Sequence, residues 1–434
     1  MRRLLLRQGA SELSYEIRGI VKKAEQVRVL GYDILWENIG DPIQKHRVVP
    51  SWMKDIIVQQ LEFDRSYGYS HSKGLLETRQ FLADKTNALG GAQIGVEDIC
   101  FFNGLGDAIG KIYQYLVPTA RVIGPSPAYS THSSAEAAHA NNHPITYKLD
   151  PDNNWYPDLD DLYLKVKYND SIVGLLVINP DNPTGMVYPR EVLERMVAIA
   201  REFNLFLIFD EIYQNITYNG ATTVPMAKVI RDVPGIAMKG ISKEFPWPGA
   251  RCGWVEYYNR RADDDFNELC QTLDNAKMIE VSSTTLPQRV IPHIMQDVRY
   301  TEFLKETNAR IGQRSKELTE YFQDIPYIHF NQTNGAFYNT MIFKSDALVP
   351  AQSMRIEDQQ LDGLLKSWLT EEMPLDKRFV YHLLAAKQVV VVPISSFASD
   401  LLGFRMTLLE EEEESRNRIY QRIKEGIIEY CTSI

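Results

Sequence analysis

Three polar residues stand at the ends of apolar runs in the middle of the chain. Lys243 ends "GIAMKGISK", Asp210 ends "LFLIFD", and Asn182 follows "SIVGLLVINP". A lysine shielded from water gives up its proton more readily and can form a Schiff base with a carbonyl compound. Taken alone, a lysine at a strand end is more often a side chain that reaches out to solvent. The catalytic interpretation therefore depends on what lies beside it.

The runs that carry these residues have the pattern of a parallel α/β fold. Segments 171–180, 205–213 and 235–243 are apolar without alternation, which is typical of strands buried on both faces. Segment 190–204 has apolar residues at helical spacing, so the order is strand, helix, strand. Ligands bind beyond the carboxyl ends of the strands in such sheets. We therefore expect one cleft to collect the polar residues that end these runs: Asn179, Asn182, Asp210 and Lys243.

Pyridoxal phosphate is the cofactor that needs such a lysine, together with an acid that holds a proton on its pyridine nitrogen. Three motifs favour it: "SKEFPWPGAR" around Lys243, "NPDNPTG" at 179–185, and "DEIY" ending at Tyr213. With these motifs in this order, the chain resembles the class I/II aminotransferases, fold-type-I pyridoxal-phosphate enzymes of the aspartate aminotransferase superfamily. The similarity extends from about Asn38 to Arg405.

The resemblance implies roles for the residues around the cofactor ring. Lys243 would form the Schiff base and later move the proton, and Asp210 would pair with the pyridine nitrogen. Asn182 and Tyr213 would hydrogen-bond the ring hydroxyl. Two further residues would support the ring, Tyr129 by stacking on it and His132 by holding the aspartate; without the resemblance both would be interpreted as ordinary core residues.

Phosphate binding is predicted at "FFNGLGDAIGKIYQYL", a short strand, a glycine-rich turn and a helix. Backbone NH groups at a helix start bind phosphate, and Arg251 would supply charge. Three residues before the lysine, where the family often has a Ser or Thr that donates to the phosphate, this chain has Gly240. Ser242 or water would take the place of that hydroxyl. The backbone groups expected at the phosphate belong to Gly104, Leu105 and Gly106.

The substrate's α-carboxylate requires a separate cation. "GFRMTLLE" resembles the family's C-terminal arginine strand, which implies that Arg405 binds it, with Asn182 and the backbone of Gly40 completing the site. Met278 and Ile279 stand where aspartate-specific members carry an arginine, which argues against a dicarboxylate amino donor.

The resemblance also implies an architecture and an assembly. A large cofactor-binding domain with a mostly parallel sheet is expected over 45–310, and a smaller α+β domain is expected from both chain ends, 1–44 and 311–434. "YSHSKG" matches the segment whose tyrosine reaches the neighbouring subunit's phosphate, so Tyr69 implies a homodimer with composite active sites.

The C-terminal part shows strand-like runs at 334–343, 387–393 and 403–410. The polar stretch 344–378 between them is longer than the usual connection. The acidic run 410–414 is expected to open the last helix as surface charge, since acidic side chains favour a helix start.

The composition excludes several classes of function. A formal charge of −10 argues against nucleic acid or an anionic membrane as a partner. The four cysteines form no CxxC pair, and His139 and His143 have no third ligand in view, so no metal site is expected. With no signal peptide and no apolar run of membrane-spanning length, a cytoplasmic protein is predicted.

The sequence thus predicts a pyridoxal-phosphate-dependent aminotransferase that moves an amino group between a neutral L-amino acid, such as alanine, and a 2-oxo acid by a ping-pong mechanism. One alternative is a carbon–sulfur lyase or an aminocyclopropane-carboxylate-synthase-like enzyme, which share these motifs. A remote alternative is a cofactor-sensing regulator, but the residues before "NIGDP" leave no room for a DNA-binding domain.

Overall fold

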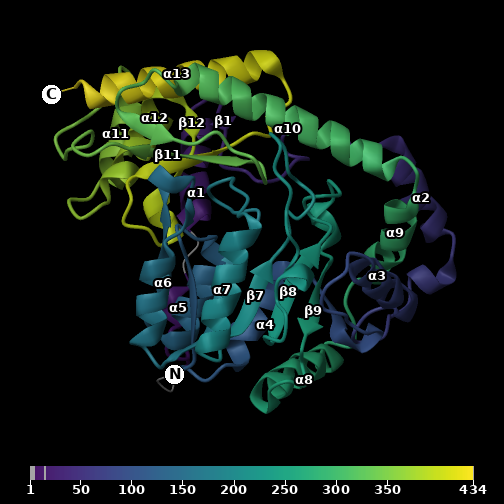
Figure 1. Ribbon diagram of the computed structural model, residues 1–434. Helices are drawn as coiled ribbons and strands as arrows, with labels where there is room; N and C mark the ends of the chain where they lie inside the picture. The colour runs from purple at the N-terminus through teal and green to yellow at the C-terminus, as the bar shows by residue number, and fades with distance from the viewer. Residues whose placement is uncertain (1–4, 14–15, 434) are drawn as a thin grey trace.

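The computed structural model describes residues 5–13 and 16–433. Two main sheets organise them, one of eight strands and one of four (Figure 1). This confirms the predicted α/β layer with a smaller α+β part. The strands of the large sheet are, in spatial order, β2 (Ile99–Phe102), β9 (Gly253–Tyr258), β8 (Gly235–Gly240), β7 (Phe206–Asp210), β6 (Ile172–Ile178), β3 (Arg121–Ser126), β4 (Thr146–Asp150) and β5 (Tyr156–Pro157).

The core of the large sheet is parallel, as predicted. Strands β8, β7, β6, β3 and β4 run in one direction, whereas β9 is antiparallel to both its neighbours and β5 is antiparallel to β4. The predicted strand 235–243 is too long, because β8 ends at Gly240, which pairs with Gly253. Beyond it the chain turns, and Pro246 and Pro248 have no N–H to offer a sheet. Lys243 therefore lies in a turn, three residues past the strand.

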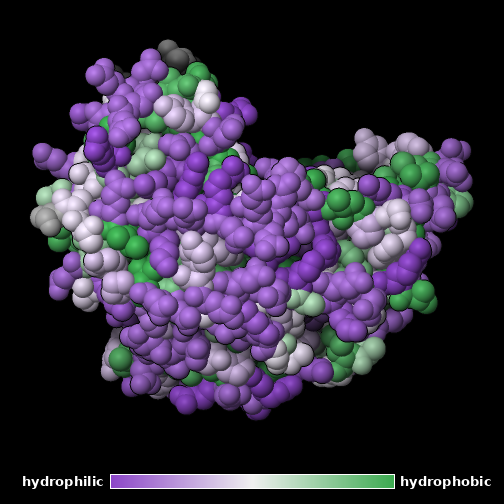
Figure 2. Space-filling model, turned by 90° about the horizontal axis from the view of Figure 1, so that it is seen from above, coloured by the Kyte–Doolittle hydropathy of each residue, from purple (hydrophilic) through white to green (hydrophobic). Residues whose placement is uncertain are grey.

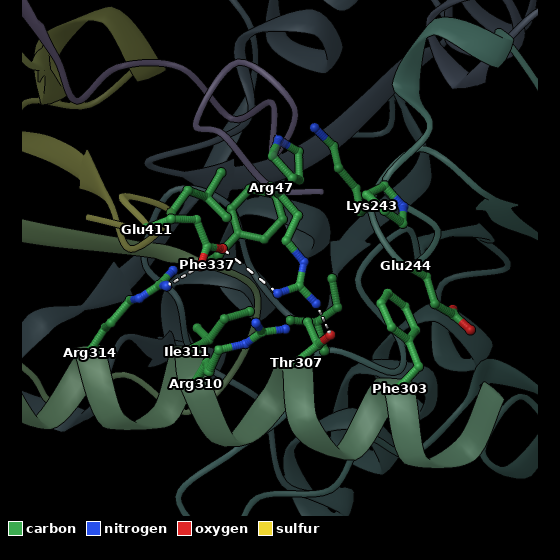
Figure 3. Close-up of a pocket in the computed structure, with 14 residues that line it drawn as sticks. Arg47, Lys243, Glu244, Phe303, Thr307, Arg310, Ile311, Arg314, Phe337 and Glu411 are labelled. Atoms are coloured by element: carbon green, nitrogen blue, oxygen red, sulfur yellow. Dashed lines mark hydrogen bonds and ion pairs between the residues drawn. The ribbon is translucent and has the colours of Figure 1, made fainter. Parts of the chain in front are cut away.

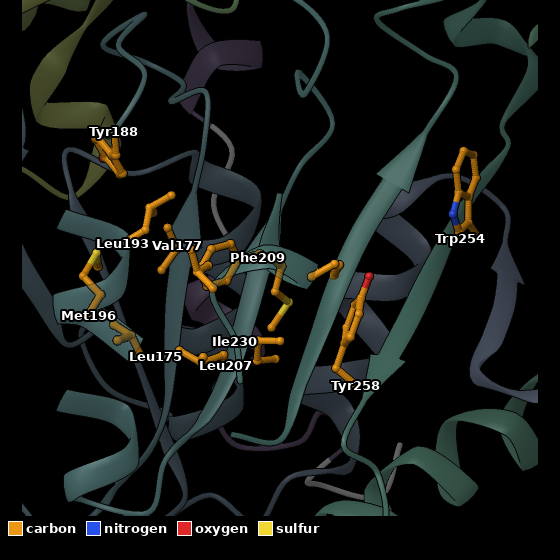
Figure 4. Packing of buried hydrophobic residues seen from close by; sticks show 14 of the residues in the cluster. Leu175, Val177, Tyr188, Leu193, Met196, Leu207, Phe209, Ile230, Trp254 and Tyr258 are labelled. Carbon is orange, nitrogen blue, oxygen red and sulfur yellow. The ribbon is translucent and has the colours of Figure 1, made fainter. Parts of the chain in front are cut away.

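Alternate residues of β6 are buried on opposite faces of the sheet. Leu175 and Val177 pack with Met196 of helix α7 (Figure 4), whereas Leu176 and Ile178 belong to a second cluster that includes helix α4. Burial on both faces explains why this run shows no polar alternation. The helices around this sheet are α2 (Ser51–Leu61), α3 (Leu76–Ala88), α4 (Leu105–Tyr115), α5 (Ser130–Ala140), α6 (Leu159–Lys167), α7 (Arg190–Glu202), α8 (Asp264–Ile279) and α9 (Thr285–Gln296).

The smaller part contains segments from both ends of the chain. Its antiparallel sheet has the order β10 (Ile328–Phe330), β11 (Tyr338–Phe343), β14 (Gly403–Thr407), β13 (Val392–Pro393). The N-terminal strand β1 (Leu35–Trp36) pairs in parallel with β12 (Val389–Val390). The long helix α10 (Tyr300–Phe322) runs from the neighbourhood of α2 and α9 to this part (Figure 1) and crosses the predicted domain limit at 310, which stays a prediction. The remaining helices are α1 (Glu16–Val29), α11 (Gln359–Trp368), α12 (Leu375–Lys387) and α13 (Glu413–Cys431).

Two expectations for the C-terminal part need correction. The stretch 344–378 is not simply a polar connection, because α11 and the start of α12 lie in it. The acidic run is only partly a helix start: α13 begins at Glu413, and the first two glutamates of the run bind cations of the interior. Glu410 Oε2 lies 3.0 Å from Lys45 Nζ, and Glu411 Oε2 lies 2.7 Å from Arg314 Nη2. These two acids therefore tie the C-terminal segment to distant parts of the chain.

The face seen from above is mainly hydrophilic, with hydrophobic residues scattered over it (Figure 2). No helix within the described ranges is both long enough and apolar enough to cross a membrane.

Candidate active site

The carboxyl ends of β3, β6, β7 and β8 open onto one cavity of about 930 Å³. It also receives the start of α4 and residues of the smaller part. The expected convergence is therefore observed for Asn182, Asp210 and Lys243. Asn179 does not line the cavity, and its Oδ1 instead accepts a hydrogen bond of 2.9 Å from the backbone N–H of Tyr188. The predicted site residues that line this cavity are Gly40, Leu105, Gly106, Tyr129, Asn182, Asp210, Tyr213, Ser242, Lys243, Arg251 and Arg405.

Asp210 is an almost fully buried carboxylate with fixed neighbours. Asp210 is the last paired residue of β7 and is 3% exposed. Oδ2 lies 3.2 Å from His132 Nε2, and Oδ1 accepts a hydrogen bond of 3.1 Å from the backbone N–H of Ile212. His132 thus lies behind the aspartate, outside the cavity lining, as its predicted supporting position requires. The carboxylate is held in one orientation by groups on either side.

The Lys243 amine donates a hydrogen bond of 2.7 Å to the carbonyl oxygen of Gly40. A second, smaller cavity of about 30 Å³ lies beside the lysine stem (Figure 3). On its far side Arg47 donates to Thr307 Oγ1 at 2.8 Å and lies 3.8 Å from Glu411. Lys243 therefore lines both cavities.

The start of α4 forms a cradle closed by an arginine. Gly104 has a φ of 84°, and a Cβ at this position would lie 2.6 Å from Arg251 Nη2. The guanidinium therefore packs directly on the glycine that precedes the first helical N–H groups. A Cβ at Gly240 would lie 3.0 Å from Ile212 Cδ1 and 3.1 Å from the carbonyl oxygen of Cys252. A side chain at this position would therefore be crowded, whereas Ser242 lines the cavity.

Arg405 is buried on β14 with spare hydrogen-bonding capacity. Its Nη1 donates to Asn182 Oδ1 at 3.1 Å and its Nη2 donates to the carbonyl oxygen of Asn38 at 2.7 Å. Its Nε is buried without a partner. The guanidinium lies between two rings, 4.4 Å from the centroid of Tyr338 and 5.1 Å from that of Phe397. A buried unpaired donor beside a cavity is a site for an anion such as a carboxylate.

Tyr213 and Tyr338 meet in the same cavity, and sequence reasoning identified only the first. Their hydroxyl oxygens are 3.0 Å apart. Burial, followed by the neighbouring Tyr338 hydroxyl, holds the pKa of Tyr213 well above its usual value, so its hydroxyl stays protonated. Tyr338 stood in the predicted strand 334–343 without a signal of its own, because only the strand register brings it to the arginine.

Most charged side chains that line this cavity are basic, although the chain as a whole is acidic. Its charged lining residues are one acid, Asp210, and five basic residues, against a formal charge of −10 for the chain. Such a concentration attracts anionic ligands. The basic residues are Arg18, Lys22, Lys243, Arg251 and Arg405.

Tyr69 is placed apart from the rest of the predicted site. It does not line the cavity and is 85% exposed. Its predicted role at a neighbouring subunit stays a prediction.

Residues 33–419 match the family model described as aminotransferase class I and II. The chain belongs to this family. It is thus an enzyme that transfers amino groups, and the family's cofactor is pyridoxal phosphate. The predicted family, reaction class and cofactor are confirmed.

Known proteins agree with this assignment over nearly the whole chain. An uncharacterized aminotransferase of Methanocaldococcus jannaschii is 50% identical over 430 residues, 99% of each chain. The glutamate-pyruvate aminotransferase AlaA of Escherichia coli K12 is 29% identical over 357 residues, 81% of this chain and 85% of that one. The solved alanine aminotransferase of Pyrococcus furiosus superposes with a TM-score of 0.83 at 25% identity, covering 98% of this chain and 100% of that one.

The residues present fit pyridoxal phosphate. The cofactor is a ring with a basic nitrogen, a hydroxyl, an aldehyde and a phosphate. The cavity offers a buried carboxylate at Asp210, a protonated phenol at Tyr213, an amine at Lys243 and the glycine–arginine cradle at Gly104 and Arg251. Each polar part of the cofactor therefore has a group of matching chemistry.

Proposed function

We propose that this aminotransferase exchanges the amino group of a neutral L-amino acid, with alanine as the preferred donor, for the oxygen of a 2-oxo acid in a ping-pong reaction. The observation that carries the proposal is the meeting of Lys243, Asp210 and Arg405 around one cavity. They provide an amine, a buried acid and a carboxylate-binding cation, the three groups that amino-group transfer requires.

The residues of this chain would divide the work as follows. When bound, pyridoxal phosphate supplies an electron-withdrawing ring that stabilises negative charge at the amino acid's Cα. Asp210 keeps the proton on the ring nitrogen, and His132 and the Ile212 N–H keep the carboxylate in place. The Lys243 amine would take the Cα proton of the bound amino acid and return a proton at the cofactor's aldehyde carbon. Its hydrogen bond to the Gly40 carbonyl holds the amine at the cavity.

The remaining predicted residues would bind the cofactor. Asn182 and Tyr213 contact the ring hydroxyl, and Tyr129 stacks on the ring. The backbone at the start of α4, with Ser242 and Arg251, takes the phosphate. The backbone groups at that helix start are those of Gly104, Leu105 and Gly106.

Alanine is proposed as the donor on two grounds. The relatives described above are a glutamate-pyruvate and an alanine aminotransferase. Met278 and Ile279, at the position expected to hold an arginine in aspartate-specific enzymes, are 57% and 85% exposed and uncharged.

A donor panel tests this substrate assignment. With a neutral 2-oxo acid as acceptor, we expect kcat/KM for alanine to exceed that for aspartate by about tenfold or more, since an unpaired buried carboxylate costs at least about 1.4 kcal/mol. Product 2-oxo acids are measured by chromatography for each donor. Equal or better use of aspartate would overturn the assignment while leaving the reaction class intact.

Substitution of Arg405 by lysine should raise the KM for the amino acid by about ten- to a hundredfold, because a point charge cannot replace the two-pronged guanidinium. Steady-state kinetics at saturating acceptor measure it. The matched control is Arg201→Lys, which alters an exposed arginine paired with Asp232 on the surface and should leave KM unchanged. An unchanged KM in the Arg405 variant would mean that the carboxylate binds elsewhere.

We further propose that the working form is a cytoplasmic homodimer in which Tyr69 reaches the partner's phosphate site. The high exposure of Tyr69 in the single chain supports this. Sedimentation of the purified protein at micromolar concentration tests it, and a monomer that remains fully active would contradict it.

A further inference from the structure

Tyr338 contacts parts of the site that the proposed function treats separately. In the antiparallel pair β11–β14, Tyr338 is opposite Thr407 and Thr340 is opposite Arg405. Tyr338 and Arg405 are therefore diagonal neighbours on one face of the sheet. This register explains why the guanidinium lies 4.4 Å from the centroid of the tyrosine ring.

The Tyr338 hydroxyl reaches two further groups of the cavity. It lies 3.0 Å from the Tyr213 hydroxyl, and a Cβ at residue 40 would lie 2.0 Å from it. Gly40 therefore leaves the space that the hydroxyl occupies, and its carbonyl oxygen accepts the hydrogen bond of Lys243. One side chain, 3% exposed, thus borders the groups proposed for substrate carboxylate, cofactor ring and proton transfer.

The direction of the bond between the two phenols follows from proton count. Each hydroxyl has one proton to donate. If Tyr213 donates its proton to the ring oxygen of the cofactor, its own oxygen must accept, so Tyr338 is the donor. A hydroxyl that accepts one hydrogen bond donates a stronger one, because chains of hydrogen bonds polarise each other.

The geometry points to Tyr338 as a positioning residue that strengthens the hydrogen bond from Tyr213 to the cofactor and orients Arg405 for the substrate carboxylate. This inference rests on the proposed function. It assigns two separable roles to one side chain: the hydroxyl acts through Tyr213, and the ring acts through Arg405.

Tyr338→Phe tests the role of the hydroxyl, because it removes only that group. A donor to the ring oxygen favours the form of the cofactor with more negative charge on that oxygen, which is the form that has lost its proton. Weakening the donor should therefore raise the midpoint pH of the visible absorbance titration of the loaded protein, by about 0.5–1 pH unit. In a Tyr213→Phe background the same substitution should add no further shift.

Tyr338→Leu tests the role of the ring, because it also removes the ring. Propionate serves as an unreactive carboxylate, and its Kd is measured by its effect on the visible band. We expect the Phe variant to keep the wild-type Kd, and the Leu variant to bind propionate about threefold to tenfold more weakly because Arg405 loses its ring contact.

Tyr218→Phe is the matched control. Its hydroxyl is also buried, bonded to Thr333 and to the carbonyl oxygen of Gly335 at 3.0 Å each, but it does not line the cavity. A midpoint that stays within 0.2 pH unit in Tyr338→Phe (on the order of the titration error), or an equal shift in Tyr218→Phe, would overturn the role of the Tyr338 hydroxyl. An unchanged propionate Kd in Tyr338→Leu would overturn the role of the Tyr338 ring. A wild-type protein without any visible band after cofactor addition would instead refute the proposed function.

Discussion

Lys243→Ala is expected to lower kcat by about ten-thousandfold or more, because it removes both the covalent attachment point and the amine that moves the proton. The fold should persist, since the lysine side chain makes one hydrogen bond, to Gly40, worth about 1 kcal/mol. Steady-state turnover and thermal melting of the same preparation measure the two effects.

The control for this substitution is Lys228→Ala. Lys228 is exposed and lies outside the cavity lining, so its variant should keep wild-type turnover. Turnover of Lys243→Ala within tenfold of the wild type would refute the assignment of this lysine, whatever the variant's stability.

Asp210→Asn should lower kcat by about a hundred- to a thousandfold, because an amide of the same shape cannot supply the charge that keeps the proton on the ring nitrogen. A hundred- to a thousandfold loss of rate corresponds to about 3–4 kcal/mol of activation free energy. The KM for the amino acid should change little, since Arg405 and not Asp210 is proposed to bind the carboxylate. Pre-steady-state rates with alanine measure the chemical step directly.

Asp232→Asn is the comparison for this variant, since that aspartate pairs with Arg201 on the surface. It should leave both constants unchanged. A full-rate Asp210→Asn enzyme would mean that the ring proton is held by another group, and a selective rise in KM would move Asp210 to the substrate site.

The central constellation could be predicted from sequence because it depends on topology alone. Asn182, Asp210 and Lys243 each follow an apolar run, and parallel strands bring their carboxyl ends to the same edge. The spacing did not reveal that Lys243 stands three residues beyond its strand. That depends on where pairing with β9 stops, which is a property of a strand further along the chain.

Two residues whose partners are distant in sequence escaped prediction. Tyr338 reaches Arg405 only through the β11–β14 register, and Glu411 is drawn inward by Arg314, a residue almost one hundred positions earlier. Helix α11 did have a local signal, since Leu361, Leu365 and Trp368 are buried at helical spacing. The stretch was described only by its polar composition, so this spacing was not used.

The most direct test of the account is the visible spectrum of the protein loaded with pyridoxal phosphate, followed through one half-reaction at a time. The account predicts that alanine removes the visible band with one equivalent per active site and that pyruvate restores it without loss. Persistence of the band while ammonia accumulates would contradict amino-group transfer and favour a lyase. The absence of any visible band after cofactor addition would contradict the role of Lys243 itself.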